Sequence, residues 1–215
     1  MSRVVVCDLG IGNLRSVARA VSAAGGVDVV IATDPAEIAQ AHAVIVPGQG
    51  AFRDGAAALA NGFGDAIRRH IEDGRPYLGI CLGLQLLFET SAESPGAQGL
   101  CVLRGHVARI ALPALPGKRP ELKLPHIGWN EVRCPDAASP SDAHGMLSSL
   151  FGKQVYFAHS YVAIPREPAC VAAVVDYGAP LVCAVAKDNV LAVQFHPEKS
   201  QRAGLAFLAA WTARI

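Results

Sequence analysis

The stretch Tyr77-Leu78-Gly79-Ile80-Cys81-Leu82-Gly83 decides the fold of this chain. Residues 75–80 are typical of a short buried strand, and residues 82–89 are typical of the helix that follows it. Cys81 is therefore predicted on the turn between them, where flanking glycines tolerate a strained backbone and let another segment approach closely. A cysteine in that position meets the positive end of a helix dipole and unpaired backbone N–H groups, which favour thiolate over thiol. The stretch indicates an α/β protein with a cysteine presented at the end of a strand.

Strand-like and helix-like runs alternate through the first half of the chain, up to about Thr90. The predicted strands are residues 4–6, 27–32, 43–46 and 75–80, and the predicted helices are residues 13–24, 35–41, 55–73 and 82–89. Continuous apolar strands between helices are typical of a parallel sheet that is covered on both faces. We therefore expect a doubly wound α/β core, mostly parallel, with helices on both faces.

The second half of the chain is predicted to extend this sheet and to add an antiparallel part. Strand-like runs cover residues 102–110, 128–133, 155–164, 169–177 and 181–195. Lys187-Asp188-Asn189 lies between two apolar runs and is typical of a hairpin turn, which implies antiparallel pairing there. Residues 112–125 and 135–144 are predicted to be irregular loops. A closing helix over residues 201–212 carries Leu205, Leu208 and Trp211 on one stripe, which we expect to pack on the core.

The composition of the chain limits the classes of function that it can have. With 215 residues, 52% of them hydrophobic and 17% charged, the chain is long enough for one sizeable core, and we expect a single domain over residues 1–215. A net charge of +1 gives no electrostatic reason to expect a nucleic acid or an anionic membrane as partner. Residues 1–8 lack the features of a signal peptide, and no run is long and apolar enough to span a membrane. We expect a cytoplasmic protein whose six cysteines are thiols, none with the CxxC spacing of a structural zinc site.

His196 and Glu198 follow the apolar run of residues 191–195, so both are predicted at the end of a strand, where α/β active sites form. Residues two apart on an extended segment point the same way, which lets Glu198 reach the ring of His196. The other ring nitrogen can then face the sulfur of Cys81, as a series of nucleophile, base and orienting carboxylate requires. Taken singly, Cys81 fits an inert buried thiol and His-Pro-Glu a solvated loop; taken together they favour a hydrolase that forms a thioester.

Residues 79–85, together with His196-Pro197-Glu198-Lys199-Ser200, closely resemble the triad class I glutamine amidotransferases, which hydrolyse glutamine and deliver ammonia to a synthase. The resemblance implies their flavodoxin-like fold. Four further segments resemble the glutaminase subunits of imidazole glycerol phosphate synthase, which work in histidine biosynthesis. They are Asp8-Leu9-Gly10-Ile11-Gly12-Asn13-Leu14, Pro47-Gly48-Gln49-Gly50-Ala51-Phe52, Pro125-His126-Ile127-Gly128-Trp129-Asn130 and Tyr156-Phe157-Ala158-His159-Ser160-Tyr161. The resemblance covers nearly the whole chain.

This resemblance assigns roles within the site. Cys81 would attack the carboxamide carbon of glutamine, His196 would take the thiol proton and later protonate ammonia, and Glu198 would orient His196. The backbone N–H groups of Leu82 and Gly50 match the oxyanion hole. Gln85, Glu93 and the segment His159-Ser160-Tyr161 match positions that bind the substrate. Gln85 could instead only cap local backbone groups, and Glu93 could be a solvated charge. No cofactor and no metal are implied.

The resemblance also implies a partner, a TIM-barrel cyclase that forms a heterodimer with the glutaminase and receives its ammonia along a docked, water-poor route. Four residues fall on family positions that face the cyclase: Asn13, Trp129, Asn130 and Lys199. Trp129 could equally be a core aromatic and Lys199 a solvated charge. Glutaminases of this kind are slow until the synthase site is filled, so weak activity is expected of the isolated chain. Gln49 departs from the family pattern beside the oxyanion loop, where valine is more common.

Three other functions fit parts of the sequence. A cysteine peptidase on the same fold would use the same turn and a histidine, but it would not need the segment His159-Ser160-Tyr161. A catalytically silent binding subunit is disfavoured by the presence of Cys81, His196 and Glu198. Within the amidotransferases, the chain could serve another synthase, such as that for anthranilate or aminodeoxychorismate.

Overall fold

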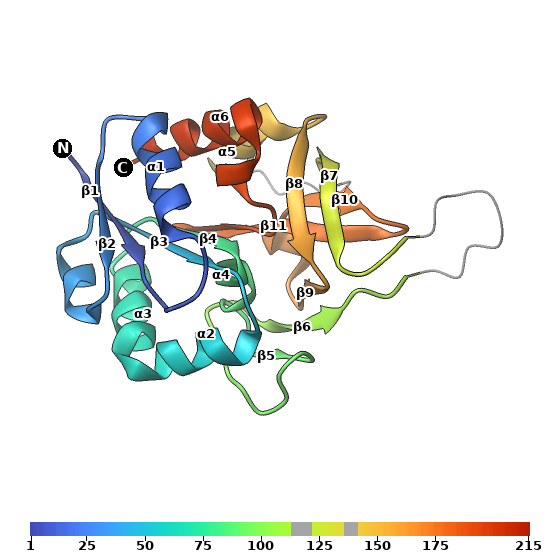
Figure 1. Ribbon diagram of the computed structural model, residues 1–215, viewed down its shortest axis with the longest axis horizontal. Coiled ribbons are helices and arrows are strands. Elements are labelled where there is room, and N and C mark those ends of the chain that lie inside the picture. The colour runs from blue at the N-terminus through green and yellow to red at the C-terminus, as the bar shows by residue number, and fades with distance from the viewer. Residues whose placement is uncertain (113–121, 136–141) are drawn as a thin grey trace.

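The computed structural model describes residues 1–112, 122–135 and 142–215. Within them, a nine-stranded sheet has the strand order β2-β1-β3-β4-β12-β11-β10-β7-β8 (Figure 1). Its strands are β1 (Arg3–Cys7), β2 (Asp28–Ala32), β3 (Ala43–Gly48), β4 (Tyr77–Cys81), β7 (His126–Arg133), β8 (Gln154–His159), β10 (Val171–Asp176), β11 (Pro180–Lys187) and β12 (Val190–Val193). A second sheet has the order β5-β6-β9, formed by β5 (Thr90–Ser91), β6 (Gly105–Arg109) and β9 (Tyr161–Pro165).

The strands β2, β1, β3, β4 and β12 pair in parallel, and helices cover both faces of this half. Helices α1 (Leu14–Ala24), α5 (Asp142–Leu147) and α6 (Gln201–Thr212) lie on one side, and α2 (Phe52–Ala58) and α3 (Gly64–Glu72) on the other (Figure 1). Along β1, Val4 and Val6 belong to one apolar core, and Val5 and Cys7 to the other. Side chains alternate along a strand, so the apolar run is buried on both faces, as predicted.

The other half of the large sheet is antiparallel. Strand β12 pairs with β11 through the hairpin at Asp188 and Asn189, and β11, β10, β7 and β8 continue in antiparallel order. The predicted doubly wound sheet with an added antiparallel part is therefore confirmed. The two parts are equal in extent, with four parallel and four antiparallel pairings among the described strands.

The predicted helix over residues 82–89 is wrong in length, because α4 spans only Leu82–Gln85. Beyond it, backbone carbonyls bond to a later segment instead of to the next helical turn. Leu86 O accepts from Leu100 N at 2.7 Å, and Leu87 O accepts from Val102 N at 2.9 Å. The buried Leu86, Leu87 and Phe88 side chains hold this turn inside the core.

Other boundaries also differ from the prediction. The strand expected over residues 155–164 is divided at Ser160 into β8 and β9, which lie in different sheets. Residues 35–41 form a 3-10 helix, η1 (Pro35–Gln40), and residues 55–73 form α2 and α3 joined by a π-helical turn, η2 (Leu59–Phe63). Shorter 3-10 turns are η3 (Ser148–Leu150), η4 (Pro168–Cys170) and η5 (Pro197–Lys199).

Helix α6 has the predicted bounds but not the predicted stripe. Leu208 and Trp211 are buried, whereas Leu205 is 39% exposed. The buried face runs through Gly204, Phe207, Leu208 and Trp211, at the i, i+3, i+4, i+7 spacing of one helical face, and Leu205 lies outside it. In the part of the chain that the structure describes, no helix is long and apolar enough to cross a bilayer.

The two predicted loops are only partly described. Residues 113–121, within the predicted loop 112–125, and residues 136–141, within the predicted loop 135–144, lie outside the described residues. Helix α5 begins at Asp142, so the last part of the second predicted loop is helical.

Candidate active site

Cys81 ends β4 in a conformation that few non-glycine residues adopt, with φ 55° and ψ −102°. The glycines on either side are required by close packing. A Cβ on Gly79 would lie 2.6 Å from the carbonyl oxygen of Gly83, and a Cβ on Gly83 would overlap the carbonyl oxygen of Val46. The strained turn predicted for this cysteine is therefore present.

The neighbours of β4 determine what surrounds the sulfur. Strand β3 pairs with β4 on one side, with Gly48 opposite Cys81, and β12 pairs on the other, with Val193 opposite Ile80. The loop after β3 and the segment after β12 therefore emerge on the two sides of Cys81. Both follow the carboxyl ends of parallel strands, where ligands bind in open α/β sheets.

His196 and Glu198 form a buried pair beside Cys81. The ring nitrogen Nδ1 of His196 lies 2.8 Å from Oε1 of Glu198, and both side chains are at most 4% exposed. The predicted contact is present, but the predicted reason is wrong, because Glu198 lies in the 3-10 turn η5 and not on an extended segment. The turn brings the carboxylate back toward the ring.

The electrostatics of His196 favour its charged form. Burial alone would lower its pKa, but the Cys81 sulfur and the Glu198 carboxylate together raise it from 6.5 to about 9. The other ring nitrogen, Nε2, is buried and has no hydrogen-bond partner among the described residues. At neutral pH the imidazole is therefore protonated and can return a proton to a leaving group.

A hollow of about 230 Å³ opens at Cys81 and brings most of the predicted site residues together. Its lining consists of Gln49, Gly50, Cys81, Leu82, Gln85, Glu93, Pro125, Ala158, His159, Ser160 and Tyr161. Both expected oxyanion residues and all five expected substrate residues belong to this lining. The hollow is thus lined by residues of β4, α4, β8 and β9 and by residues that follow β3 and β5, which are far apart in the sequence.

Several of these side chains are also engaged within the protein. Gln85 Nε2 donates to the carbonyl oxygen of Tyr161 and to Oε1 of Gln194, each at 3.2 Å. Glu93 Oε2 accepts from the backbone N–H of Phe52 at 2.8 Å, at the start of α2. Gln85 and Glu93 therefore help to hold the walls of the hollow in place.

His159 is buried in a pair with His126. His159 Nδ1 lies 2.9 Å from the carbonyl oxygen of Tyr161, and its Nε2 lies 3.1 Å from Nδ1 of His126. Burial lowers the pKa of His159 to about 4, with a further lowering by nearby His196, and burial likewise lowers that of His126 to about 4. Both rings are neutral at pH 7, so His159 can fix the segment of Ser160 and Tyr161 without adding charge.

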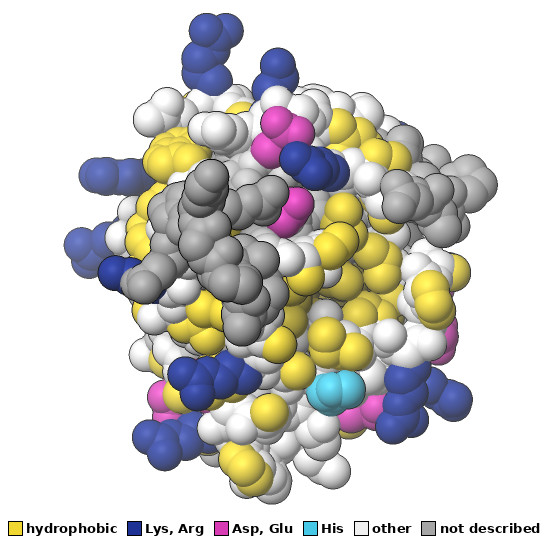
Figure 2. Space-filling model, turned by 90° about the vertical axis from the view of Figure 1, so that its right-hand side faces the viewer, with side chains coloured by type: hydrophobic (Ala, Val, Ile, Leu, Met, Phe, Trp, Pro, Cys, Tyr) yellow, Lys and Arg dark blue, Asp and Glu magenta, His cyan; other side chains and the backbone are white. Residues whose placement is uncertain are grey.

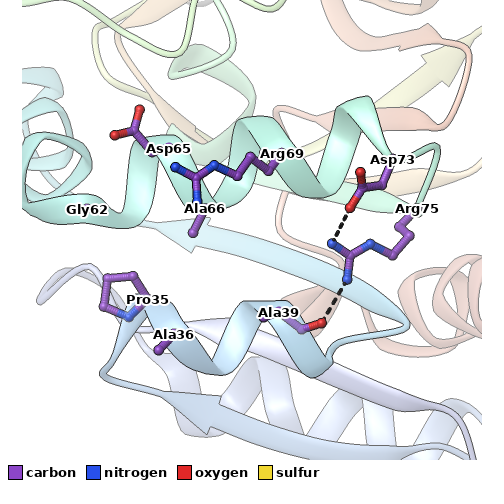
Figure 3. Close-up of a pocket in the computed structure, with 9 residues that line it drawn as sticks. All are labelled: Pro35, Ala36, Ala39, Gly62, Asp65, Ala66, Arg69, Asp73 and Arg75. Carbon is purple, nitrogen blue, oxygen red and sulfur yellow. Dashed lines mark hydrogen bonds and ion pairs between the residues drawn. The ribbon is translucent and has the colours of Figure 1, made fainter.

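A larger hollow, of about 550 Å³, lies between η1 and α3 and contains none of the predicted site residues (Figure 3). Arg75 at its edge is tied to Asp73 at 2.8 Å and to the carbonyl oxygen of Ala39 at 3.2 Å. Its lining includes no cysteine, serine or histidine. The larger of these two hollows is therefore not the one that contains the predicted site residues.

Comparisons with known proteins agree with this geometry. The family model described as glutamine amidotransferase class-I matches residues 5–212. The chain is 47% identical to the imidazole glycerol phosphate synthase subunit HisH of Syntrophotalea carbinolica, over 95% of this chain and 97% of that protein. The chain belongs to the HisH family of class-I glutamine amidotransferases. It is also 43% identical to the HisH subunit of Aquifex aeolicus, over 96% of this chain and 94% of that protein. A solved structure titled "Crystal structure of glutamine amidotransferase" shares the fold, with a TM-score of 0.71 at 21% identity over 97% of this chain and 98% of that one.

Membership of the HisH family favours one of the functions left open by the sequence. The curated relatives at 40–47% identity carry the HisH name, and each is matched over nearly its full length. An amidotransferase subunit of the anthranilate or aminodeoxychorismate type and a cysteine peptidase are therefore disfavoured.

The four positions expected to face a partner do not all point the same way in this HisH-family chain. Trp129 is 43% exposed and meets Tyr156 edge-on at 6.1 Å, and Lys199 Nζ lies 5.6 Å from the centre of the same ring. Asn130, the next residue along β7, turns to the other side and donates to the carbonyl oxygen of Asp176 at 2.8 Å. Asn13 caps α1 by accepting from the N–H of Ser16 at 3.2 Å.

Two site residues were missed by reasoning from the sequence. Gln194 is fully buried, and its Nε2 donates to the sulfur of Cys81 at 3.5 Å. His126 is buried between the rings of Phe157 and Tyr177. A signal for Gln194 was present, since it is the one polar residue of the apolar run 191–195. For His126, the only signal is the pairing of β7 with β8, which places His126 opposite His159. Across the described residues, no three His, Cys, Asp or Glu side chains gather as metal ligands.

Proposed function

We propose that this chain is the glutaminase subunit of an imidazole glycerol phosphate synthase, which hydrolyses glutamine through a Cys81 thioester and passes the ammonia to a cyclase subunit. The observation that carries the chemistry is the buried His196–Glu198 pair beside Cys81, in which the pKa of His196 is raised to about 9. Nucleophile, proton carrier and orienting carboxylate follow one another in that order. Membership of the HisH family supports the substrate and the pathway.

The first half of the reaction forms the thioester. The Cys81 sulfur attacks the carboxamide carbon of glutamine, and His196 holds the proton that left the thiol. The oxygen of the tetrahedral intermediate becomes negative, and the backbone N–H groups of Leu82 and Gly50, which border the same hollow, are proposed to bind it. When the C–N bond breaks, His196 protonates the departing amine and ammonia leaves.

The second half releases glutamate. Water loses a proton to His196 as it attacks the thioester carbon, the C–S bond breaks, and the thiol regains its proton. Glu198 orients the ring and stabilises its positive charge throughout, without moving a proton itself. Gln85, Glu93 and the segment from His159 to Tyr161 are proposed to bind the amino and carboxylate groups of glutamine, because they line the hollow that opens at Cys81.

The partner is proposed to be a TIM-barrel cyclase that forms a heterodimer with this chain. On the end of the molecule where the antiparallel strands lie, hydrophobic side chains gather next to basic ones (Figure 2). Ile127 and Trp129 of β7 and Ile164 of β9 are large apolar side chains exposed on strands of this part, by 62%, 43% and 42%. Exposed aromatic and aliphatic side chains of this kind are typical of protein interfaces. We further propose that the chain acts in the cytoplasm as one domain, which fits a family match over residues 5–212 and six free cysteines.

Glutamine-dependent and ammonium-dependent synthesis test the proposal when measured on the complex with the cyclase. The variant Cys81→Ala should abolish synthesis from glutamine and leave synthesis from ammonium intact. A matched control is Cys101→Ala, since Cys101 is an exposed thiol outside the hollow and its loss should affect neither rate. Loss of both rates in Cys81→Ala would mean that Cys81 is structural. If glutamine hydrolysis persists in this variant, Cys81 is not the nucleophile.

The interface can be tested separately by titrating the cyclase with variants of this chain. Trp129→Ala should weaken binding by about tenfold or more, because buried tryptophans carry much of the energy of an interface. Leu205→Ala is the control, since Leu205 is also exposed but lies on α6. Unchanged affinity in Trp129→Ala would place the cyclase on another face.

A further inference from the structure

Gln194 is placed beside the nucleophile by the register of two neighbouring strands. Val193 of β12 is opposite Ile80 of β4 in the parallel pairing, so the next residues, Gln194 and Cys81, leave the sheet side by side. The Gln194 side chain is fully buried, and its backbone N–H donates to the carbonyl oxygen of Cys183 at 2.9 Å. The glutamine therefore has a fixed position against the sulfur.

The direction of the Gln194 amide is determined by a chain of hydrogen bonds that starts at a backbone carbonyl. The carbonyl oxygen of Tyr161 can only accept, so the Gln85 atom 3.2 Å from it must be the amide nitrogen. That nitrogen also lies 3.2 Å from Gln194, which must therefore present its oxygen there. The nitrogen of Gln194 is left to face Cys81, with Nε2 to Sγ at 3.5 Å. Because an amide nitrogen only donates, the sulfur is the acceptor.

We propose that Gln194 takes part in catalysis by donating an N–H to the Cys81 sulfur, which holds the sulfur in place and favours its thiolate form. A hydrogen bond to a charged acceptor is stronger than one to a neutral acceptor, so this contact stabilises the thiolate more than the thiol. Gln85 acts through Gln194, because it holds the amide in the orientation that points nitrogen at sulfur. The inference rests on the proposed role of Cys81 as nucleophile.

Other ionisable groups also surround the sulfur. His196 faces it from the segment after β12, with Glu198 behind, and the remaining ionisable side chains of the hollow are Glu93, His159 and Tyr161. Substitutions at Gln194 leave all of these in place. A change in the pH at which Cys81 becomes reactive would therefore report on the Gln194 contact.

The experiment measures the rate of Cys81 alkylation by iodoacetamide as a function of pH, on the full chain bound to its cyclase, with glutaminase kcat and KM measured alongside. In Gln194→Leu the midpoint of the profile should rise, and alkylation at pH 7 should slow by about fivefold or more, since the charge-assisted donor is lost. Gln194→Glu should raise the midpoint further, because a carboxylate oxygen then faces the sulfur. In both variants kcat should fall more than KM rises.

Matched controls separate this inference from the proposed function. Gln154→Leu removes an exposed glutamine of β8 and should leave the profile unchanged. If Cys81 of the unsubstituted chain is neither alkylated nor needed for glutamine hydrolysis, the proposed function fails. If it is needed, and both Gln194 variants fold and keep the profile and kcat of the parent chain, only the Gln194 inference is overturned. Failure of both variants to fold would show a structural role alone, which would also overturn it.

Discussion

Replacing Gly79 by alanine tests whether the packing of the turn, and not only its sequence, places Cys81. Gly79 does not have a positive φ, so its backbone suits alanine. The added Cβ would lie 2.6 Å from Gly83 O and 2.9 Å from Ala192 Cβ, whereas ordinary contact begins at 3.4 Å. The Gly83 carbonyl must move by about 0.8 Å to make room, and this carbonyl also accepts the hydrogen bond from the Tyr77 hydroxyl at 2.9 Å.

Two effects follow from that displacement. Overpacking in a close-packed core costs about 1–3 kcal/mol of the free energy of unfolding. A shift of about 1 Å in a catalytic group costs about a hundredfold in rate, so kcat for glutamine should fall by tenfold to a hundredfold even where the protein is folded. Urea denaturation measures the first effect, and glutamate release by the complex with the cyclase measures the second.

Gly145→Ala provides the control for this prediction. Gly145 lies in α5, and a Cβ there would meet only the Arg214 guanidinium, at 3.6 Å. Alanine in a helix is more stable than glycine by about 0.5–1 kcal/mol, so this variant should be at least as stable as the parent chain and equally active. If Gly79→Ala matched the parent chain within about 0.5 kcal/mol and twofold in kcat, the argument that close packing holds the turn would be refuted.

Three further predictions concern charge and core packing. Glu198→Gln should slow glutamine turnover far less than loss of Cys81, and should lower the pKa of His196 from about 9 toward 6.5. The parent chain should therefore have a higher free energy of unfolding than this variant, by at most about 3 kcal/mol at pH 6. In urea titrations this difference should fade as pH rises through 9. Burial lowers the pKa of His70 to about 4, so folding should lose stability as pH falls below 6.5; His70→Leu should reduce the loss between pH 7 and pH 5 by about 2 kcal/mol, and equal slopes would contradict this. Phe207→Ala should cost about 3–5 kcal/mol by thermal or urea unfolding, while Leu205→Ala, on the exposed side of the same helix, should cost less than about 0.5 kcal/mol.

The local sequence predicted those elements that have a clear helical periodicity or a continuous apolar run. Helix α6 has the predicted bounds, and β1 to β4 lie within two residues of theirs, because apolar runs and helical periodicity leave few alternatives. The end of α4 could not be predicted in the same way. Leu86 and Leu87 continue a good helical pattern, yet their carbonyls bond to Leu100 and Val102. A tertiary contact therefore decides where that helix ends.

The candidate site was likewise only partly predictable from local sequence. Cys81, His196 and Glu198 could be found from residue types at recognisable spacings. For Gln194 the sequence offers only a polar residue within an apolar run, and its contact with Cys81 depends on the pairing of β12 with β4. The place of His126 in the site depends on the pairing of β7 with β8. The reason for the His196–Glu198 contact could also be found only in the structure. A 3-10 turn brings Oε1 of Glu198 to 2.8 Å from Nδ1 of His196.

By itself the sequence determined the α/β class of this protein, the turn that presents Cys81 and the family to which the chain belongs, because each of these follows from short motifs of neighbouring residues, whatever the distance between the motifs. Only the tertiary structure decided which segments surround the sulfur. The strand order β3-β4-β12 sets the loop of Gln49 and Gly50 on one side of Cys81 and the segment from Gln194 to Glu198 on the other. Strand pairing joins residues that are distant in sequence. Which of their atoms donates and which accepts in each hydrogen bond follows from that arrangement in space.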